Sequence, residues 1–587
     1  MRRRTYGWVQ NPSDFSKLKR TVQIFDSNSE HYQNLKTNLV QELIPFEEIR
    51  TKLLSKLENG TTEFTYLELV GTQRAKDGKR SSSRKTVVAD SLIQVSLPSQ
   101  SATTTGKTWT DNWTSAGYLS WALSLNFLHH DRDTDVCSIT ETGLDFSNTE
   151  EGSSEELELL RQAFLRYPPA TQVLRVLSEA QQPVTKFYIG SRLGFKGEKG
   201  FTSYREDLMQ DWLINSSDIE ARKIRQDIEG TSDKYARMIA GWLEKVGFVK
   251  SNSSKVITSS GNKRTGFRKY SITGLGQHAF RQAQGNSSNS AVEKYLTWEF
   301  LAVGTADSDY IRSRRSLILK SLSKSSSERV LVQTLEEKGY GDDFSVIEND
   351  IKGLNTFGLR IEKVESGFDL KDPIVAFSIP EVLKSPGQKN AALRAFKERI
   401  MARTDLEPQY YELIDIAYDG NRSRDFEMLT IDILTNVYGF SGKLLGGGRR
   451  PDGLVYTEDF GITIDAKAYS KGYGKNISQE DEMVRYIEDN QLRDELRNPT
   501  KWWEGFSDSI PVSAYHFLWV SSEFKETFTA QLQSASARTK STGGALDVEQ
   551  LLLGADLIQK GKLNLSEVES ALCNEVIAWD RGVSLLL

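Results

Sequence analysis

Two acidic side chains and one lysine stand at a spacing that suits the hydrolysis of a phosphodiester bond. Pro451-Asp452 is followed, after a turn, by an apolar run over residues 461–467 that ends in Asp465-Ala466-Lys467. Carboxylate oxygens bind Mg²⁺ and leave open positions for water and phosphate. The bound ion polarises the phosphate and lowers the pKa of its water, while a lysine can orient that water and offset the developing charge. Asp452, Asp465 and Lys467 are therefore the candidate catalytic residues.

A β-strand over residues 461–467 would place two of these groups in one site. Side chains alternate across a strand. The even-numbered residues of this run are apolar and should face the core, whereas Asp465 and Lys467 are odd-numbered and should share the opposite face. The hairpin turn before the run brings Asp452, at the start of the preceding strand, alongside them.

This arrangement resembles the Pro-Asp…Asp-x-Lys pattern of the PD-(D/E)xK nuclease superfamily. The resemblance implies a Mg²⁺ site formed by Asp452, Asp465 and the backbone carbonyl of Ala466. Glu427, on an upstream predicted helix, could assist metal binding, or it could be an ordinary acid on a helix surface. The alternative for the whole motif is a solvated Asp-x-Lys at a strand edge, which is common by chance.

The segments that precede this motif share a pattern. A predicted helix over residues 117–128 is followed by Ser138-Ile139-Thr140 and Gly143, and one over 234–246 by Ser271-Ile272-Thr273 and Gly276. Helices followed by a β-hairpin are typical of winged helix-turn-helix modules. The recurrence of Ser-Ile-Thr-x-x-Gly indicates a duplicated unit. A third unit is expected over residues 308–372, and a linker containing proline and glycine follows it.

Longer stretches make the chain similar to the FokI-like type IIS restriction endonucleases. The matches run in one order along nearly the whole chain, and they include residues 6–12, 200–203, 229–238, 348–354, 481–486 and the pair Trp502-Trp503. The resemblance implies a multidomain α+β fold. Three winged-helix or helix-turn-helix-type DNA-recognition subdomains would precede a linker and a C-terminal α/β PD-(D/E)xK nuclease domain with a mixed sheet. The expected bounds are 1–150, 151–286 and 287–379 for the subdomains (the third regulatory or packing), 380–390 for the linker and 391–587 for the nuclease domain.

The resemblance also implies that the first two subdomains recognise an asymmetric double-stranded DNA site, GGATG, and that cleavage falls at a fixed distance outside it. The base-contacting candidates are Gln10, Asn11, Arg84, Gln100, Trp113 and Ser115 in the first subdomain and Gln226, Glu229, Lys234 and Arg237 in the second. These residue types suit base edges in the major groove. Gln226 stands where the prototype of the family has asparagine. The alternative for each candidate is a helix cap or a phosphate contact, which carries no sequence information.

Double-strand cleavage is expected to need transient pairing of two nuclease domains. The family resemblance places Asp481 and Arg485 at this symmetric contact, Asp481 of one copy meeting Arg485 of the other. Their spacing of four residues on a predicted helix also allows a simple intrahelical ion pair. Two interface isoleucines of the prototype are replaced by Arg497 and Arg538 in this chain.

The composition of the chain narrows the classes of protein to which it could belong. The chain has 587 residues, a net charge of -5, two distant cysteines and five histidines, which argues against a disulfide framework or zinc chemistry. No apolar run reaches the length of a membrane span, and a prokaryotic cytoplasmic location is expected. Host DNA would need protection by a separate cognate methyltransferase. The rival hypotheses are a winged-helix regulator with an inactive C-terminal domain and a strand-nicking relative.

Overall fold

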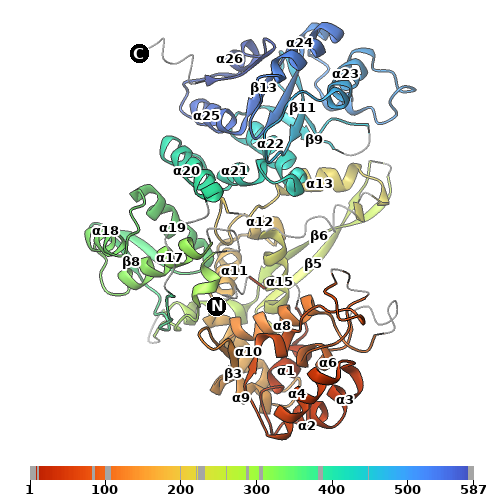
Figure 1. Ribbon diagram of the computed structural model, residues 1–587. Coiled ribbons are helices and arrows are strands. Elements are labelled where there is room, and N and C mark those ends of the chain that lie inside the picture. Colours follow the sequence, from red (N-terminus) through yellow and green to blue (C-terminus); the bar gives the residue numbers. More distant parts are fainter. Residues whose placement is uncertain are drawn as a thin grey trace.

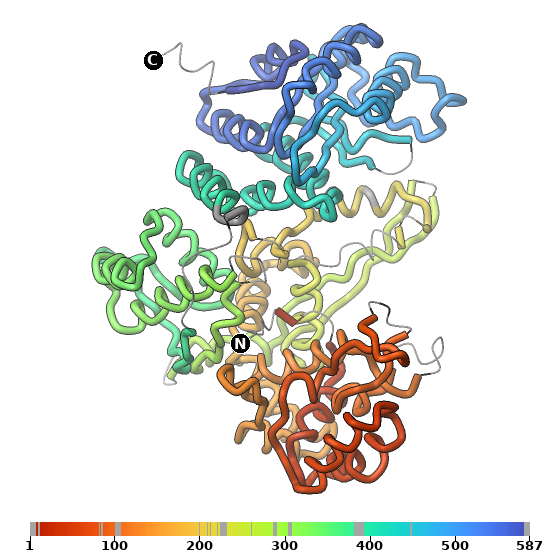
Figure 2. The backbone as a smooth tube through the Cα atoms, in the orientation of Figure 1, coloured from red at the N-terminus to blue at the C-terminus, as the bar shows by residue number. Residues whose placement is uncertain are grey.

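The computed structural model describes residues 8–9, 12–81, 83, 86–99, 107–198, 200–219, 221–222, 232–259, 261–285, 290–302, 308–380, 388–446 and 449–579. The first subdomain lies at one end of the molecule and the C-terminal domain at the other, with the second and third subdomains between them (Figures 1 and 2). This multidomain α+β architecture confirms the fold class expected from the sequence.

The first subdomain is mainly helical and contains a three-stranded sheet in the order β1-β3-β2. Asp111 caps its helix α8 by accepting a hydrogen bond from the Thr114 amide (2.8 Å), so that the helix begins before the predicted position. Its elements are α1 (Phe15–Gln23), α2 (Glu30–Asn34), the π-helix η1 (Leu35–Leu39), α3 (Val40–Leu43), α4 (Glu47–Glu58), β1 (Phe64–Thr65), α5 (Tyr66–Val70), α6 (Leu92–Ser96), α8 (Asn112–Ser124), β2 (Leu128–Asp131), β3 (Val136–Ile139) and α9 (Glu141–Asn148).

The second subdomain repeats the order of a helix, a hairpin and a further helix. Its sheet has the order β4-β6-β5, and the long strands β5 and β6 form a hairpin that extends from the body of the subdomain (Figure 1). Its elements are α10 (Ser154–Arg166), α11 (Pro168–Glu179), β4 (Val184–Thr185), α12 (Lys186–Gly190), α13 (Glu206–Asn215), α15 (Ser232–Lys245), β5 (Val249–Ile257), β6 (Lys263–Ile272) and α16 (Gly274–Ala283).

One joint closes the hairpin in both subdomains. Thr140 caps α9 by accepting a hydrogen bond from the Gly143 amide, and Thr273 caps α16 in the same way from Gly276, each at 3.0 Å. A Cβ at these two glycines would lie 1.9 and 2.1 Å from a backbone carbonyl oxygen. Because no side chain fits there, both positions need glycine. The repeated sequence thus corresponds to a repeated threonine–glycine joint.

The third subdomain has α-helices followed by a hairpin, as expected of a third unit of this kind. Its elements are η2 (Trp298–Leu301), α17 (Ser308–Leu322), α18 (Glu328–Glu337), α19 (Phe344–Phe357), β7 (Ile361–Val364) and β8 (Gly367–Leu370). Two arginines of α17 are buried against one acid of α19: Arg314 Nε lies 2.6 Å and Arg315 Nε 2.8 Å from the carboxylate of Asp350. These ion pairs hold the two helices together.

The C-terminal domain is built on a six-stranded mixed sheet in the order β14-β13-β12-β11-β10-β9. Strands β9, β10 and β11 are antiparallel neighbours, and β11 to β14 are parallel. Helices cover both faces of the sheet (Figure 1). The elements are α20 (Gln388–Arg403), η3 (Pro408–Tyr411), α21 (Glu412–Ala417), η4 (Gly420–Arg422), α22 (Ser423–Asn436), β9 (Ser441–Leu444), β10 (Gly453–Tyr456), β11 (Gly461–Lys467), α23 (Ile477–Leu492), η5 (Trp502–Gly505), η6 (Val512–Ala514), β12 (Tyr515–Ser521), α24 (Phe528–Thr539), β13 (Gly543–Asp547), α25 (Val548–Gln559), α26 (Leu565–Ser570) and β14 (Glu575–Val576).

Strand β11 is an inner strand, so both of its faces are buried. Ile462, Ile464 and Ala466 join the core on the side of α22, as predicted. The opposite face, which the sequence assigned to the site alone, is also covered: Thr463 and Asp465 are each only 2% exposed. An inner strand of a sheet that helices cover on both faces is normally buried on both sides, and here that burial restricts the site to the end of the strand.

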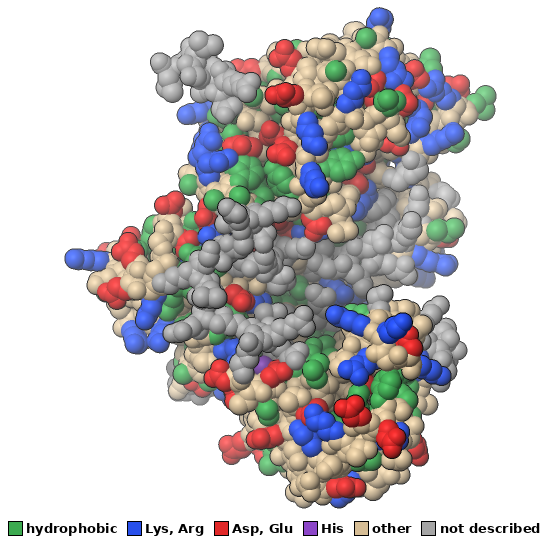
Figure 3. All heavy atoms as spheres, in the orientation of Figure 1, with side chains coloured by type: hydrophobic (Ala, Val, Ile, Leu, Met, Phe, Trp, Pro, Cys, Tyr) green, Lys and Arg blue, Asp and Glu red, His purple; other side chains and the backbone are tan. Residues whose placement is uncertain are grey.

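Charged side chains of both signs are mixed on the face of the molecule in Figure 3, with no broad basic patch on the parts drawn in colour. This mixture agrees with the net charge of -5. None of the helices in the described ranges is long and apolar enough to cross a membrane.

Candidate active site

Asp452, Asp465 and Lys467 meet at the ends of two neighbouring strands. Gly453 of β10 lies opposite Ile464 of β11, and this antiparallel register continued by one residue places Asp452 opposite Asp465. The Ala466 amide donates a hydrogen bond to Asp452 Oδ2 (2.8 Å). Lys467 Nζ lies 2.7 Å from Asp465 Oδ1 and 3.9 Å from Asp452 Oδ2. The structure therefore brings together the three side chains that the sequence singled out.

The electrostatics of this cluster are those of a crowded acidic site. Burial raises the pKa of Asp452 well above its usual value, and the charges of Asp465 and Glu427 raise it further. Burial acts against the charge of Lys467, but the attraction of Asp465 and then of Asp452 outweighs it, so the pKa of Lys467 is raised. The lysine thus stays protonated between the two carboxylates.

The donor set fits a hard divalent cation. Asp465 Oδ2 is buried and has no hydrogen-bond partner among the described residues. A buried carboxylate oxygen is normally satisfied, so one that is not suits a cation ligand. No group of three or more His, Cys, Asp or Glu side chains in the described ranges could enclose a metal ion by itself. Two carboxylates and backbone oxygens would leave positions open, as Mg²⁺ requires for water and phosphate.

Glu427 lies on α22, near enough to Asp452 for its charge to raise the pKa of that carboxyl group. Its Oε2 is 2.6 Å from Nη1 of Arg424, one turn earlier on the helix. The side chain of Arg424 also lies against the turn before Asp452. A Cβ at Gly446, which has φ +62°, would lie 2.0 Å from Arg424 Nη1. Arg424 was not among the residues predicted from the sequence. The spacing of three residues between Arg424 and Glu427 on one helix was the signal that could have found it.

Most of the predicted base-contacting residues lie outside the described residues, namely Gln10, Asn11, Arg84, Gln100, Gln226 and Glu229. The others lie on two helices. On α8, Trp113 is partly exposed, but Ser115 is fully buried and its hydroxyl donates to the Asp111 carbonyl at 3.0 Å. On α15, Arg237 is exposed, whereas Lys234 is only 7% exposed. Of these four, Trp113 and Arg237 have accessible surface for DNA in this conformation.

Asp481 and Arg485, the residues predicted at the dimer contact, lie on α23. Asp481 forms an ion pair with Arg538 and not the simple intrahelical pair with Arg485. Asp481 Oδ1 lies 2.8 Å from Nη1 of Arg538 on α24, and the same nitrogen lies 3.1 Å from Glu480. Arg485 Nε is buried and has no hydrogen-bond partner in the described part of the chain. Arg497 pairs with Glu488 and, at 2.9 Å, with Asp489. Arg497 and Arg538 stand where the prototype of the family has isoleucines, and both form ion pairs with acidic side chains of α23.

Helix-and-hairpin modules joined to a sheet that carries two carboxylates and a lysine define a site-specific DNA endonuclease. Models of the FokI family match four successive parts of the chain: recognition subdomain 1 over residues 4–149, recognition subdomain 2 over 156–288, the D3 domain over 301–366 and the cleavage domain over 389–578. The chain belongs to the FokI family of type II restriction enzymes.

Individual relatives are similar to this chain in sequence along nearly their whole length. The type II restriction enzyme FokI of Planomicrobium okeanokoites is 39% identical over 576 residues, which cover 96% of this chain and 97% of the relative. StsI of Streptococcus sanguinis is 29% identical over 608 residues, covering 99% and 97%. Solved structures of FokI bound to DNA and of FokI superpose with a TM-score of 0.89 at 38% identity, covering 98% of this chain and 100% of theirs.

Proposed function

We propose that this chain binds an asymmetric duplex site, GGATG, and hydrolyses both strands at a fixed distance outside it, in a reaction that depends on Mg²⁺. The observation that carries the proposal is the convergence of Asp452, Asp465 and Lys467 around a buried carboxylate oxygen to which none of the described residues donates a hydrogen bond. The similarity to restriction enzymes over nearly the whole chain supports it.

Asp452, Asp465 and the Ala466 carbonyl would hold the Mg²⁺. When bound, this ion supplies Lewis acidity that activates water and the scissile phosphate. The protein itself orients these groups. The Ala466 amide fixes one oxygen of Asp452, and Asp465 fixes the ammonium group of Lys467. Lys467 can then hold the attacking water in place by a hydrogen bond and offset the negative charge that builds on the phosphate.

Recognition would lie in the first two subdomains. Arg237 is exposed on α15, the helix that precedes the hairpin of the second subdomain. Arginine binds guanine O6 and N7 in the major groove. Trp113 is the corresponding accessible candidate on α8. The other eight candidates named from the sequence complete the proposed contact set, with Ser115 and Lys234 needing a local rearrangement to reach a base. Residues 380–390 would link recognition to cleavage, and the third subdomain would regulate or pack the nuclease domain.

The pH at which the cleavage rate falls on the acid side should depend on the charges around Asp452. Cleavage needs this carboxylate charged, and because its pKa is raised above the ordinary value of 3.8, activity should fall at a higher pH than a free aspartate would impose. Glu427→Gln removes a repulsive charge, so the pKa of Asp452 should drop and the acid limb should move to lower pH. The measurement is the cleavage rate against pH at fixed Mg²⁺. Glu549→Gln is the control, because Glu549 on α25 pairs with Arg399 and Arg403 of α20 and is not among the charges that shift the pKa of Asp452. An unmoved midpoint in Glu427→Gln would contradict the expectation.

Double-strand cleavage would use two copies whose Asp481 and Arg485 pair across a two-fold axis. Asp481→Arg makes both positions basic and Arg485→Asp makes both acidic, so each variant alone should cut duplex DNA about tenfold more slowly or worse because like charges meet. A mixture of the two variants pairs opposite charges and should regain the lost rate. No recovery in the mixture would favour contacts confined to one copy, such as the Asp481–Arg538 pair.

The overall proposal is tested by digesting a mixed-sequence DNA with Mg²⁺ and sequencing the fragment ends. Ends at one distance from GGATG on both strands are the expected result. Breaks on one strand only would favour the nicking relative, and binding without any breaks would favour the regulator. Host DNA would be protected by a cognate methyltransferase, and the proposed partners of the chain are duplex DNA and a second copy.

A further inference from the structure

Three buried polar side chains of the first subdomain meet around Gly71, the residue that follows α5. They are Asp90, Gln94 and Asn112, here called the Gly71 cluster, and each is at most 3% exposed. A Cβ at Gly71 would lie between 2.0 and 2.9 Å from a side-chain atom of each of them. Because its φ is +85° and a side chain has no space there, this position requires glycine.

Hydrogen bonds join the members of the cluster to one another and to the backbone. The Gln94 side-chain amide donates to Asn112 Oδ1 (3.1 Å), and its oxygen accepts from the Asp90 backbone amide (2.8 Å). Asn112 donates in turn to the Val70 carbonyl (2.6 Å). The Asp90 carboxylate accepts from the backbone amide of Thr72 (2.9 Å) and from its hydroxyl. Such a buried network rigidifies the segments that it joins, which here are the end of α5, the helix α6 and the start of α8.

The segments that carry the proposed base contacts of this subdomain begin or end at the cluster. The segment over residues 72–90 includes Arg84, and the segment over 94–112 includes Gln100. The helix α8 begins at the last cluster residue, immediately before Trp113. A displacement of the cluster would therefore displace the ends of all three segments.

The second subdomain has a similar arrangement at the start of α15. Trp121 of α8 and Trp242 of α15 stack with their ring centroids 4.8 Å apart, and the buried residues Asn112 and Asp233 precede them by the same number of positions. Asp233 Oδ1 lies 2.2 Å from where a Cβ of Gly190, the last residue of α12, would be. In both subdomains a buried polar residue at the start of the helix thus packs against a glycine at the end of an earlier helix. This repetition indicates a role that the two subdomains share, and base recognition is proposed for both.

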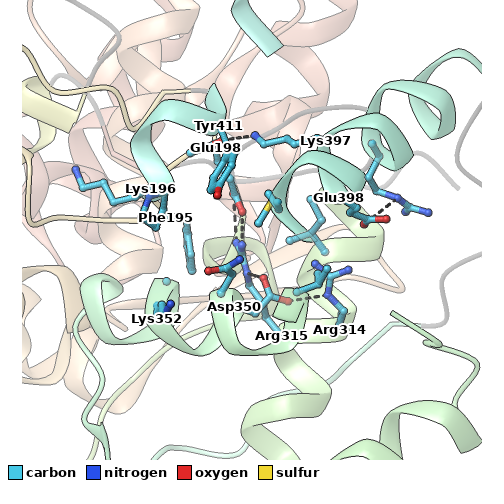
Figure 4. Close-up of a pocket in the computed structure, with 18 of the residues that line it drawn as sticks. Phe195, Lys196, Glu198, Arg314, Arg315, Asp350, Lys352, Lys397, Glu398 and Tyr411 are labelled. Atoms are coloured by element: carbon cyan, nitrogen blue, oxygen red, sulfur yellow. Dashed lines mark hydrogen bonds and ion pairs between the residues drawn. The ribbon is translucent and has the colours of Figure 1, made fainter. Parts of the chain in front are cut away.

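The two arrangements have different surroundings. The segment that follows Gly190 lines a cavity of about 260 Å³ with Phe195, Lys196 and Glu198, and residues of the third subdomain and of the nuclease domain form other walls (Figure 4). The helix α6 of the first subdomain packs against α1, α5 and α8 of the same subdomain. Substitutions in the Gly71 cluster therefore test its role within one subdomain.

We propose that Gln94 and Asn112 are positioning residues for base recognition, because the Gly71 cluster holds the three segments in the arrangement needed by DNA before DNA binds. A surface that is already ordered loses less conformational entropy on binding, and side chains that support a contact residue keep it in the productive geometry. Loss of the cluster should weaken recognition of the base pairs contacted by the first subdomain and spare those contacted by the second. This inference rests on the proposed function, in which Arg84, Gln100 and Trp113 contact bases.

The test measures discrimination at each base pair of GGATG in turn. Affinities of the full chain, without Mg²⁺, are compared for a duplex with the site and for duplexes in which one base pair is substituted. Gln94→Met nearly keeps the volume of the buried side chain and removes its hydrogen bonds, so it should lower discrimination about fivefold or more. The loss, which Asn112→Leu should share, is expected at base pairs that Arg237→Ala leaves unaffected.

Tyr32→Phe is the control for a general loss of stability of the first subdomain. Tyr32 is 1% exposed, and its hydroxyl donates to the Thr61 carbonyl (2.7 Å), outside the Gly71 cluster. This variant should keep discrimination at every base pair. The proposal would be overturned by an equal effect of Tyr32→Phe, by a loss spread evenly over the site in Gln94→Met, or by no loss in Gln94→Met.

A measurement on the wild-type chain covers the case in which the variants do not fold. The backbone amides of Thr72 and Asp90 donate within the cluster, and that of Thr110 donates to the Gln94 carbonyl (3.0 Å). These amides should exchange slowly with solvent in the free chain, because the cluster forms before DNA binds. Rapid exchange that slows only when the duplex with the site is added would overturn the proposal. A wild-type chain that does not discriminate between the duplexes contradicts the proposed function, whereas discrimination together with an overturning result contradicts only the inference.

Discussion

Asp465→Asn is expected to lower the rate of Mg²⁺-dependent DNA cleavage by about a thousandfold or more, the scale seen when one preorganised electrostatic group is removed. The substitution keeps the shape of a side chain that is 2% exposed. It removes the charge that pairs with Lys467 at 2.7 Å and the oxygen that fits a cation. Both the cation and the lysine therefore lose their anchor. Single-turnover cleavage of a duplex containing the site measures the effect.

DNA binding should survive this change, because the recognition subdomains are separate from the nuclease sheet. Asp556→Asn provides the control: this carboxylate is also buried, and it accepts from the Asp405 amide at 2.8 Å, away from the site. The control should cleave at nearly the normal rate. Full activity in Asp465→Asn, or equal losses in the two variants, would remove Asp465 from the catalytic set.

Arg237→Ala is expected to reduce discrimination between the site and other sequences by about 5-fold to 150-fold, which corresponds to about 1–3 kcal/mol. The reason is that a guanidinium bound to guanine O6 and N7 has no equivalent partner at the other bases. Titration of the protein with duplexes that contain or lack GGATG measures the ratio of the two affinities. A phosphate contact would instead weaken both affinities alike and leave the ratio unchanged.

Arg329→Ala serves as the matched control for this experiment. Arg329 is an exposed arginine on α18 of the third subdomain, so its loss changes the net charge equally. It should leave the ratio of affinities unaltered. If the two arginine variants lower discrimination to the same extent, the assignment of Arg237 to a base is wrong.

The candidate catalytic cluster could be predicted because a strand has a simple geometry. Asp465 and Lys467 are two residues apart, so alternation alone put them on one face, and the short turn placed Asp452 beside them. The helix-and-hairpin modules were predictable for a similar reason, since their signals are local. The fold class as a whole also drew on the resemblance to the family.

Contacts between distant residues could not be predicted in this way. The parallel pairing of β11 with β12 joins residues about fifty positions apart and buries the second face of β11. The bond from Tyr204 to Asp425 spans 221 positions. Residue type also predicted the exposure of polar side chains poorly. Ser115 is of a type that can contact a base, yet it is buried and its hydroxyl donates to the Asp111 carbonyl at the start of its own helix. Residue type gives the chemistry of a side chain, whereas its exposure follows from packing.

The threonine–glycine joint has a consequence for engineering. Gly143 and Gly276 occupy equivalent places, and each has a backbone carbonyl oxygen where a Cβ would be. Since both hairpins end in the same backbone geometry, a chimaera spliced at these two joints would meet little mismatch in the main chain. The helices and hairpins on either side could then be exchanged as cassettes, while the glycines themselves would have to be kept.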